Sequence, residues 1–241
     1  MTVRPSTIAR GVAVAMLLTV IAGAVGQGAI LTSILDPAAP GAVLAAATDH
    51  AGTYRLAVVL LTVEMIFQLA AVTLWHRLMR PAGPGLAVLA LALGIVGTAI
   101  KAASRTGLIA PLAMVEHDLL SQGFDQSQRA ELATGAVAFG DIAAGIGIMF
   151  LGASTVAFAV LMFRSGYVPR WLAVVVGASA SGWLLFADPI LGPALFIPIS
   201  MAGLVGALAL IVRLLGWGVD DAAWAGREAA LYRAPAADAR P

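Results

Sequence analysis

Six long apolar runs, each able to cross a lipid bilayer, constrain what this chain can fold into more than any other feature. A transmembrane helix needs about 20 apolar residues to cross the hydrocarbon core. With 61% hydrophobic and 11% charged residues, the composition also lies far from that of a water-soluble domain. The sequence predicts an all-α, polytopic integral membrane bundle of six transmembrane helices, which lie near Gly11 to Leu31, Tyr54 to Trp75, Gly85 to Ser104, Ala136 to Phe163, Trp171 to Ala187 and Gly192 to Leu214.

Charged residues in the segments between the runs predict the orientation of the bundle. Every second segment carries arginine, and these residues fall on one side: Arg4, Arg10, Arg77, Arg80, Arg164, Arg170 and Arg213. The opposite segments carry the acids Asp36, Asp49, Glu116, Asp118, Asp125, Glu131 and Asp188. By the positive-inside rule the arginine side is cytoplasmic. We therefore expect a multi-pass protein of a bacterial inner membrane, with residues 1–10 as a cytoplasmic N-terminus, 11–214 as the transmembrane domain and 215–241 as a cytoplasmic tail.

Composition excludes several kinds of site. The chain has no cysteine, which removes disulfides and thiolate chemistry, and its three histidines, His50, His76 and His117, have no metal-ligand spacing. A net charge of +1 without a basic patch gives no reason to expect nucleic-acid binding. The first apolar run follows arginines as a signal peptide does, but it continues to Leu35, longer than the usual apolar stretch of about 7–15 residues. We expect a membrane span there, and no metal and no cofactor in the bundle.

The outer loops and the tail predict smaller elements. The alanine-rich segment from Gly41 to Ala47 predicts a short interfacial helix, and Ser121 to Asp125 has the composition of a turn. Asp125 followed by Gln128 resembles a capping box, which predicts a helix that leads into the fourth span. The segment after Arg213 has mixed charges and then a stretch of alanine, proline and aspartate, which predicts an interfacial helix followed by disorder.

Polar residues inside the apolar runs are the candidates for function, because an ionised group at the bilayer centre costs about 2.5–3.5 kcal/mol. Glu64 lies midway along the second span, with Gln68 one turn later on the same face. Lys101 is the single lysine of the chain and shares a stripe of the third span with Arg105 and small residues such as Gly94 and Gly97. Such residues need a partner inside the bundle or a ligand.

Further polar residues fall in the outer half of the predicted bundle. They are Gln27 in the first span, Asp141 near the outer end of the fourth and Asp188 at the end of the fifth. We hypothesise a pocket that opens to the outer side, with Glu64 at its floor, and a ligand site made of Gln27, Glu64, Gln68, Lys101, Arg105, Asp141 and Asp188.

Structural roles account for the same residues. Lys101 and Asp141 could neutralise each other as an ion pair between the third and fourth spans, and the glycine stripes could be surfaces that let helices approach closely. Apolar neighbours would favour the neutral form of Glu64, either hydrogen-bonded in place or poised as a proton donor. The sequence does not decide between these roles and the pocket.

One segment carries a family resemblance. From Phe163 to Leu172 the chain reads FRSGYVPRWL, so that a span ends, turns through Gly166 and Pro169, and restarts, with Tyr167 and Trp171 expected at headgroup level. Together with Tyr54-Arg55 at the start of the second span and HRLMRP, residues 76–81, at its end, the layout resembles a bacterial integral-membrane family, domain of unknown function 4386. The resemblance implies a six-helix fold and supplies no catalytic residues.

Three classes of function remain open. The bundle could bind a small or lipophilic ligand for transport or sensing. Transporters often break a helix at the ligand site, and Pro198 with Gly203 and Gly206 predicts such a break in the sixth span. It could be an intramembrane enzyme in which Glu64 acts as the catalytic acid on an isoprenoid-like substrate, with Asp141 or Asp188 completing the site and Phe67 and Trp183 stabilising a cation. It could be a partner subunit that uses its small-residue faces to contact another membrane protein. All three place the chain in contact with lipid.

Overall fold

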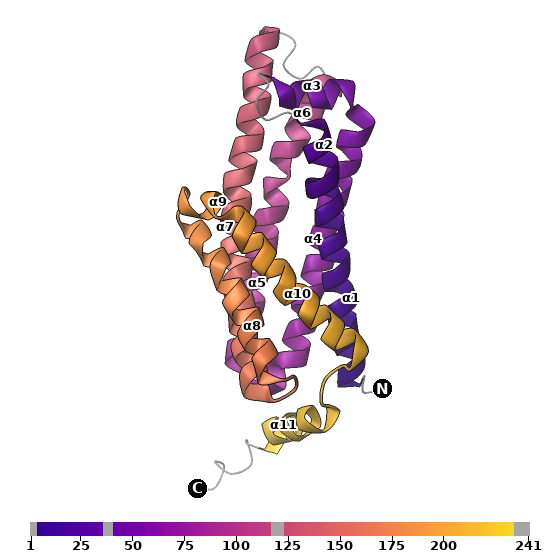
Figure 1. Cartoon of the computed structure of the whole chain (residues 1–241), viewed down its shortest axis with the longest axis vertical. Helices are drawn as coiled ribbons and strands as arrows, with labels where there is room; N and C mark the ends of the chain where they lie inside the picture. Colours follow the sequence, from indigo (N-terminus) through magenta and orange to yellow (C-terminus); the bar gives the residue numbers. More distant parts are fainter. Residues whose placement is uncertain (1–3, 36–40, 117–122, 234–241) are drawn as a thin grey trace, which may run out of the picture.

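A computed structural model describes residues 4–35, 41–116 and 123–233 of the chain (Figure 1). Within these ranges six helical stretches are long and apolar enough to cross a membrane, as predicted. In chain order the elements are α1 (Pro5–Gly23), the π-helix η1 (Ala24–Leu31), α2 (Thr32–Ile34), α3 (Ala42–Asp49), α4 (Ala51–Met79), η2 (Arg80–Ala82), α5 (Pro84–Ser104), α6 (Thr106–Glu116), α7 (Gln126–Ser165), α8 (Arg170–Ser181), η3 (Gly182–Ala187), α9 (Leu191–Ala194), α10 (Phe196–Gly216) and α11 (Asp221–Arg233).

The six spans form a ring in which chain neighbours are also neighbours in space. α1 packs on α4, α4 on α5, α5 on α7, α7 on α8 and α8 on α10, and α10 returns to α1. Figure 1 shows that both ends of the described chain lie at the same end of this ring, beneath which α11 is placed. Because the helices alternate in direction, the arginines of the short segments also gather at this end, which we call the arginine end.

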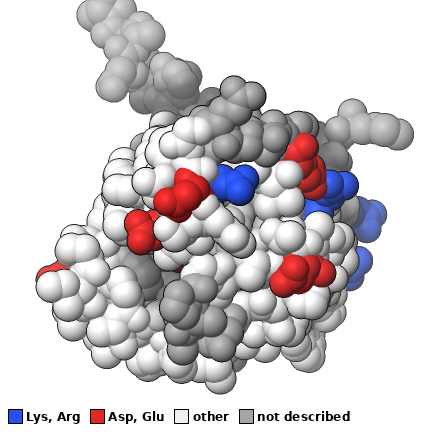
Figure 2. Space-filling model, turned by 90° about the horizontal axis from the view of Figure 1, so that it is seen from above, with Lys and Arg blue, Asp and Glu red and all other residues white. Residues whose placement is uncertain are grey.

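The last two spans cover only part of the bundle. α7 has 40 residues and is about 60 Å long, whereas the stretch made by α8 and η3 has 18 residues. Figure 1 shows α8 beside the lower part of α7, α9 at mid-height, and α10 running diagonally down from there toward the lower end of α1. Above that level α3 packs on α4, α6 and α7. The bundle therefore has two parts, a six-helix ring at the arginine end and a smaller cap at the other end, whose surface carries scattered acidic side chains (Figure 2).

The smaller elements predicted from the loops are confirmed where they are described. α3 begins at Ala42, and Asp125 forms the complete capping box of α7, because its carboxylate accepts from the Gln128 amide at 2.9 Å while its own amide donates to the Gln128 side chain. The hydrogen bonds to this carboxylate lower the pKa of Asp125. Ser121, with the start of the predicted turn, lies outside the described residues, as do Asp36, His117, Asp118 and the end of the tail.

One sequence expectation about the sixth span is wrong. Pro198, with Gly203 and Gly206, suggested a break inside the span, but α10 runs uninterrupted from Phe196, and the interruption lies before it at Leu195. Proline fits the first turn of a helix because the amide it lacks has no intrahelical partner there. The two glycines are packing sites, since a Cβ on Gly203 would lie 3.0 Å from the Trp183 ring.

Close packing of α5 on α7 confirms the structural role expected for the glycine stripe of the third span. A Cβ on Gly97 would lie 2.7 Å from the carbonyl oxygen of Gly147, and one on Gly94 would lie 2.9 Å from the Ser154 hydroxyl. The Ser154 hydroxyl also donates to the Ala90 carbonyl at 2.7 Å. Small residues therefore bring the two backbones together, as in other membrane helix pairs.

The core of the arginine end is completed by the tail. α11 lies under the ring, where Trp224 is 9% exposed and its ring N–H donates to the Leu78 carbonyl at 2.9 Å. Tyr167, expected at headgroup level, is instead 1% exposed, because the segment leading to α11 covers it and the Asp220 amide donates to its carbonyl. Burial raises the pKa of Tyr167 to about 12. Trp171 is 62% exposed, as a headgroup residue would be.

Candidate functional site

Glu64 is buried on the inner side of α4, about 22 Å along the helix from Met79 at the arginine end. It is 5% exposed. The first span approaches it through Gly23, where a Cβ would lie 3.4 Å from the Glu64 carboxylate. A glycine at this point of α1 therefore leaves the carboxylate room between the first and second spans.

Two cations meet the Glu64 carboxylate. Nζ of Lys101 lies 2.6 Å from Oε1, and Nη2 of Arg105 lies 3.3 Å from Oε2. The side chains of Glu64, Lys101 and Arg105 are 6%, 15% and 9% exposed, so this is a buried ion triad. The expectation of apolar neighbours for Glu64 is therefore wrong, since its carboxylate contacts two cations.

The pairing of Lys101 also differs from the alternative that the sequence suggested. Lys101 forms its ion pair with Glu64 of α4, and the pair with Asp141 of α7 is not formed. Lys101 lies on α5, which packs on both α4 and α7, and its backbone faces Gly147 of α7 while its side chain crosses to α4. Asp141 is exposed and interacts electrostatically with Arg105.

Arg105 stands at a break in the third span. α5 ends at Ser104 and α6 starts at Thr106, so Arg105 occupies the junction and its guanidinium points back to Glu64. Its Nε atom is buried and has no hydrogen-bond partner. Buried polar atoms are normally satisfied, so an unpaired donor on a buried cation calls for an explanation.

Tyr54 adds a second unpaired polar atom to the same side of the bundle. It lies on α4 about 15 Å beyond Glu64, away from the arginine end, and is fully buried. Its hydroxyl has no hydrogen-bond partner, and Asp141 is close enough to interact with it electrostatically. Sequence reasoning treated Tyr54 only as the start of a span. The signal in the sequence was that Tyr54 lies on the same face of the helix as Glu64. Residues 54, 57, 61 and 64 follow the helical period and are all buried.

Besides Asp141, three predicted site residues lie outside the ion triad. Gln27 is exposed, because Gly23 and Gly26 form the face of the first span that meets α4, and the next residue turns away. Gln68 is partly buried one turn below Glu64. Asp188 is exposed in the turn before α9, where its carboxylate accepts from the amides of Ile190 and Leu191 at 2.8 and 2.9 Å. These bonds lower the pKa of Asp188, which acts here as a turn residue.

Irregular helix geometry occurs at the level of the ion triad. The first span changes from α- to π-helix at Ala24, directly after the glycine that meets Glu64, and the third span breaks at Arg105. π-Helical segments are rare and frequently mark functional sites. The two spans that flank α4 are thus both irregular near the Glu64 carboxylate.

The contacts of this cluster limit what it can do. Both carboxylate oxygens of Glu64 contact cations of the third span, through Lys101 and Arg105. Within the described residues no group of three histidine, aspartate or glutamate side chains could hold a metal ion. Trp183 packs with Phe186 and Phe196 around η3, so its aromatic neighbours come from the fifth and sixth spans rather than from α4.

Comparisons with known proteins agree with this architecture. Searches among curated proteins and among solved structures gave no match. Residues 12–218 match the family described as domain of unknown function DUF4386. That match covers the first span from residue 12 onward, the other five spans in full, and the start of the segment that leads to α11. The chain therefore belongs to the DUF4386 family of membrane-spanning helical bundles.

Proposed function

We propose that the chain binds a small amphipathic anion at the Glu64–Lys101–Arg105 triad, for transport or for sensing. The observation that carries the proposal is the imbalance of the buried charges, since two cations share one carboxylate. A carboxylate or phosphate group of a ligand would supply the missing negative charge, and it would accept hydrogen bonds that the buried cations can donate.

Unpaired polar atoms support a ligand with acceptor oxygens. Arg105 Nε and the Tyr54 hydroxyl are both buried without partners, and both lie on the outer side of Glu64. A ligand that contacts both would extend from Arg105 toward the cap. Because the two atoms are inaccessible, its entry requires a local opening, and α3, which packs on α4, α6 and α7, is the element that would have to move.

The membrane orientation belongs to the same proposal. With the arginine end in the cytoplasm, both termini and α11 are cytoplasmic and the triad lies toward the outer leaflet of a bacterial inner membrane. Residues 1–10, 11–214 and 215–241 then form the cytoplasmic N-terminus, the transmembrane domain and the cytoplasmic tail. Ligand would reach Lys101, whose side chain keeps 15% exposure, from the outer side.

The packing of the glycine faces weighs against a purely structural partner subunit. Gly94, Gly97 and Gly147 pack within the chain, so they are not surfaces that remain open for another protein. Closely packed small residues at internal contacts stabilise the bundle itself. We therefore prefer ligand binding over the partner role.

Replacing Tyr54 with phenylalanine tests the binding proposal without removing a charge. Tyr54→Phe deletes a buried hydroxyl that has no protein partner, so folding stability should be unchanged or slightly higher. We expect a compound that copurifies with the wild-type protein in detergent to be depleted at least about fivefold, the value of one lost hydrogen bond of about 1 kcal/mol. Untargeted mass spectrometry of copurified small molecules and lipids measures this.

Tyr167→Phe is the matched control for Tyr54→Phe. Tyr167 is also buried with an unpaired hydroxyl, but it lies at the arginine end. Its variant should retain the same compounds as the wild type. Identical molecules in all three samples would contradict a ligand site at Tyr54.

Labelling of single cysteines tests the orientation, since the chain contains none of its own. Gln126→Cys at the start of α7 and Ala229→Cys in α11 are both at exposed positions. We expect a membrane-impermeant maleimide to label the first variant in intact cells and the second only after permeabilisation. The reverse pattern would place the arginine end outside and overturn the proposed direction of ligand entry.

A further inference from the structure

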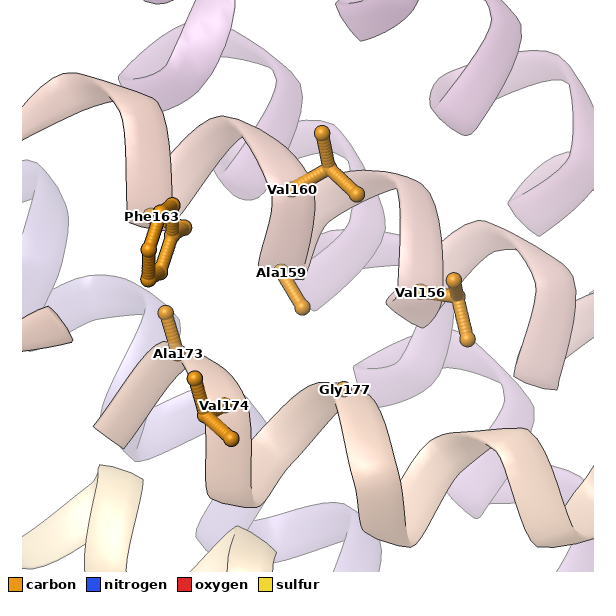
Figure 3. A pocket seen from close by; sticks show the side chains of 7 residues that line it. All are labelled: Val156, Ala159, Val160, Phe163, Ala173, Val174 and Gly177. Carbon is orange, nitrogen blue, oxygen red and sulfur yellow. The ribbon is translucent and has the colours of Figure 1, made fainter. Parts of the chain in front are cut away.

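An open apolar groove lies between α7 and α8, far from the ion triad. Seven residues line its volume of about 210 Å³: Val156, Ala159, Val160, Phe163, Ala173, Val174 and Gly177 (Figure 3). Small residues form the floor, where a Cβ on Gly177 would lie 3.2 Å from that of Ala159. Valines and Phe163 form the walls, and Val174 and Phe163 are 56% and 44% exposed.

The groove lies at the depth of lipid chains. Its residues on α7 stand about 3–14 Å from Ser165 at the arginine end of that helix, within one leaflet of a hydrocarbon core about 30 Å thick. In a membrane the groove therefore faces the acyl chains of the leaflet at the arginine end.

Cations stand where the groove reaches the headgroups. The Arg170 guanidinium lies 5.5 Å from the centre of the Phe163 ring, so it covers the end of the groove wall. Arg164 follows Phe163 and is exposed, and Arg227 of α11 donates to its carbonyl at 2.6 Å. Trp171, next to Arg170, is 62% exposed at the same level. An apolar channel thus ends among guanidinium groups.

We propose that this groove holds one acyl chain of an anionic phospholipid whose phosphate contacts Arg170 and Arg164. Charge complementarity selects this occupant, because the rim is cationic and, in the orientation proposed above, lies at the cytoplasmic leaflet, which carries anionic lipids. A second copy of the chain would bring identical arginines to the same rim, and their repulsion would oppose that contact. The site is independent of the ion triad and of any ligand there.

Native mass spectrometry of the full-length protein in detergent, titrated with dioleoyl phosphatidylglycerol, tests the lipid site. Arg170→Gln removes a headgroup contact, and Val174→Phe fills the groove from its exposed side. We expect Arg170→Gln to weaken phosphatidylglycerol binding about fivefold or more, since one arginine near a membrane contributes about 1 kcal/mol. We expect at least the same loss for Val174→Phe, because its ring takes the place of the acyl chain. Val160→Phe fills the opposite wall and should act as Val174→Phe does, which guards against a local folding effect.

Matched controls separate the site from general charge and surface effects. Arg10→Gln removes an exposed arginine of α1 at the same end, and Val88→Phe enlarges a valine of α5 that is 56% exposed at the same depth. Both should bind phosphatidylglycerol as the wild type does, and dioleoyl phosphatidylcholine should bind the wild type more weakly. Equal weakening by controls and site variants overturns the proposal, as does full binding by both groove-filling variants. A dimer that dissociates in Val174→Phe while lipid binding stays intact would assign the groove to a second copy and overturn it equally.

Discussion

Glu64→Gln should destabilise the protein by about 3–5 kcal/mol, the largest effect that we expect from a single substitution. Removing one partner of a buried ion pair leaves the other charge uncompensated. Here it leaves two, Lys101 and Arg105, whose side chains are 15% and 9% exposed. Unfolding in detergent, followed by circular dichroism against denaturant, measures the loss.

The control for this prediction is a carboxylate with the same kind of partner but more exposure. Glu116 pairs with Arg55 at the cap end of the bundle, with side chains that are 33% and 60% exposed. Glu116→Gln should cost less than about 1 kcal/mol, as exposed ion pairs do. In the double variant Glu64→Gln, Lys101→Met one cation leaves with the carboxylate, so stability should recover part of the loss. A Glu64→Gln protein as stable as Glu116→Gln would contradict a buried, charged triad.

This expectation changes how Glu64 can be used as a probe of function. A loss of activity in Glu64→Gln would report loss of folding together with any loss of binding, since the carboxylate joins the second span to Lys101 and Arg105 of the third. Tyr54→Phe separates the two effects because it removes no ion pair.

Gly97→Ala should destabilise the protein by about 1–3 kcal/mol, the usual cost of overpacking. The added methyl group would lie 2.7 Å from the Gly147 carbonyl oxygen and 2.9 Å from the Leu151 amide nitrogen, both backbone atoms that cannot rotate away. α5 and α7 would have to separate. The same unfolding measurement in detergent tests this prediction.

Gly135→Ala is the matched control, because Gly135 is also inside a helix but has no heavy atom within 4 Å of its Cβ position. It should be neutral or stabilising by up to about 1 kcal/mol, since alanine is the better helix former. If both variants gain stability, the α5–α7 contact is looser than the structure describes.

Hydropathy along the sequence was enough to predict the six spans, because a span needs only sufficient length and apolar composition. Local chemistry was also readable, as the Asp125–Gln128 capping box and the helix after Gly41 show. These features depend on residues within a few positions of one another. Pro198 predicts a break in the sixth span on the same local grounds, but it stands in the first turn of α10, where a proline fits a helix.

Side-chain partners across the bundle were harder to predict. Lys101 projects from a helix with two neighbours, and nothing in its spacing tells whether it reaches α4 or α7. Gln27 shares its level with Gly26, but a rotation of one residue turns its side chain outward. Tyr167 is of a residue type that is common at the headgroup level. It is buried only because a segment about 50 residues later in the chain folds over it. These three outcomes depend on which helices are neighbours, on how each helix is rotated and on which distant segment covers a side chain. The spacing of residues in a single sequence does not specify these relations.

The contact between Ser6 and Asp221 joins the two ends of the fold, so it can form only late in the synthesis of the chain. The Ser6 amide and hydroxyl donate to the Asp221 carboxylate at 3.0 and 2.6 Å, so an acid 215 positions later caps the first helix. At about 5–20 residues per second, a ribosome adds that acid roughly 10–40 s after the serine. Throughout that interval the first helix lies in the bilayer with an uncapped amide end and without α10, the sixth span, beside it. A newly made chain therefore stays vulnerable to quality-control proteases until its final segments emerge.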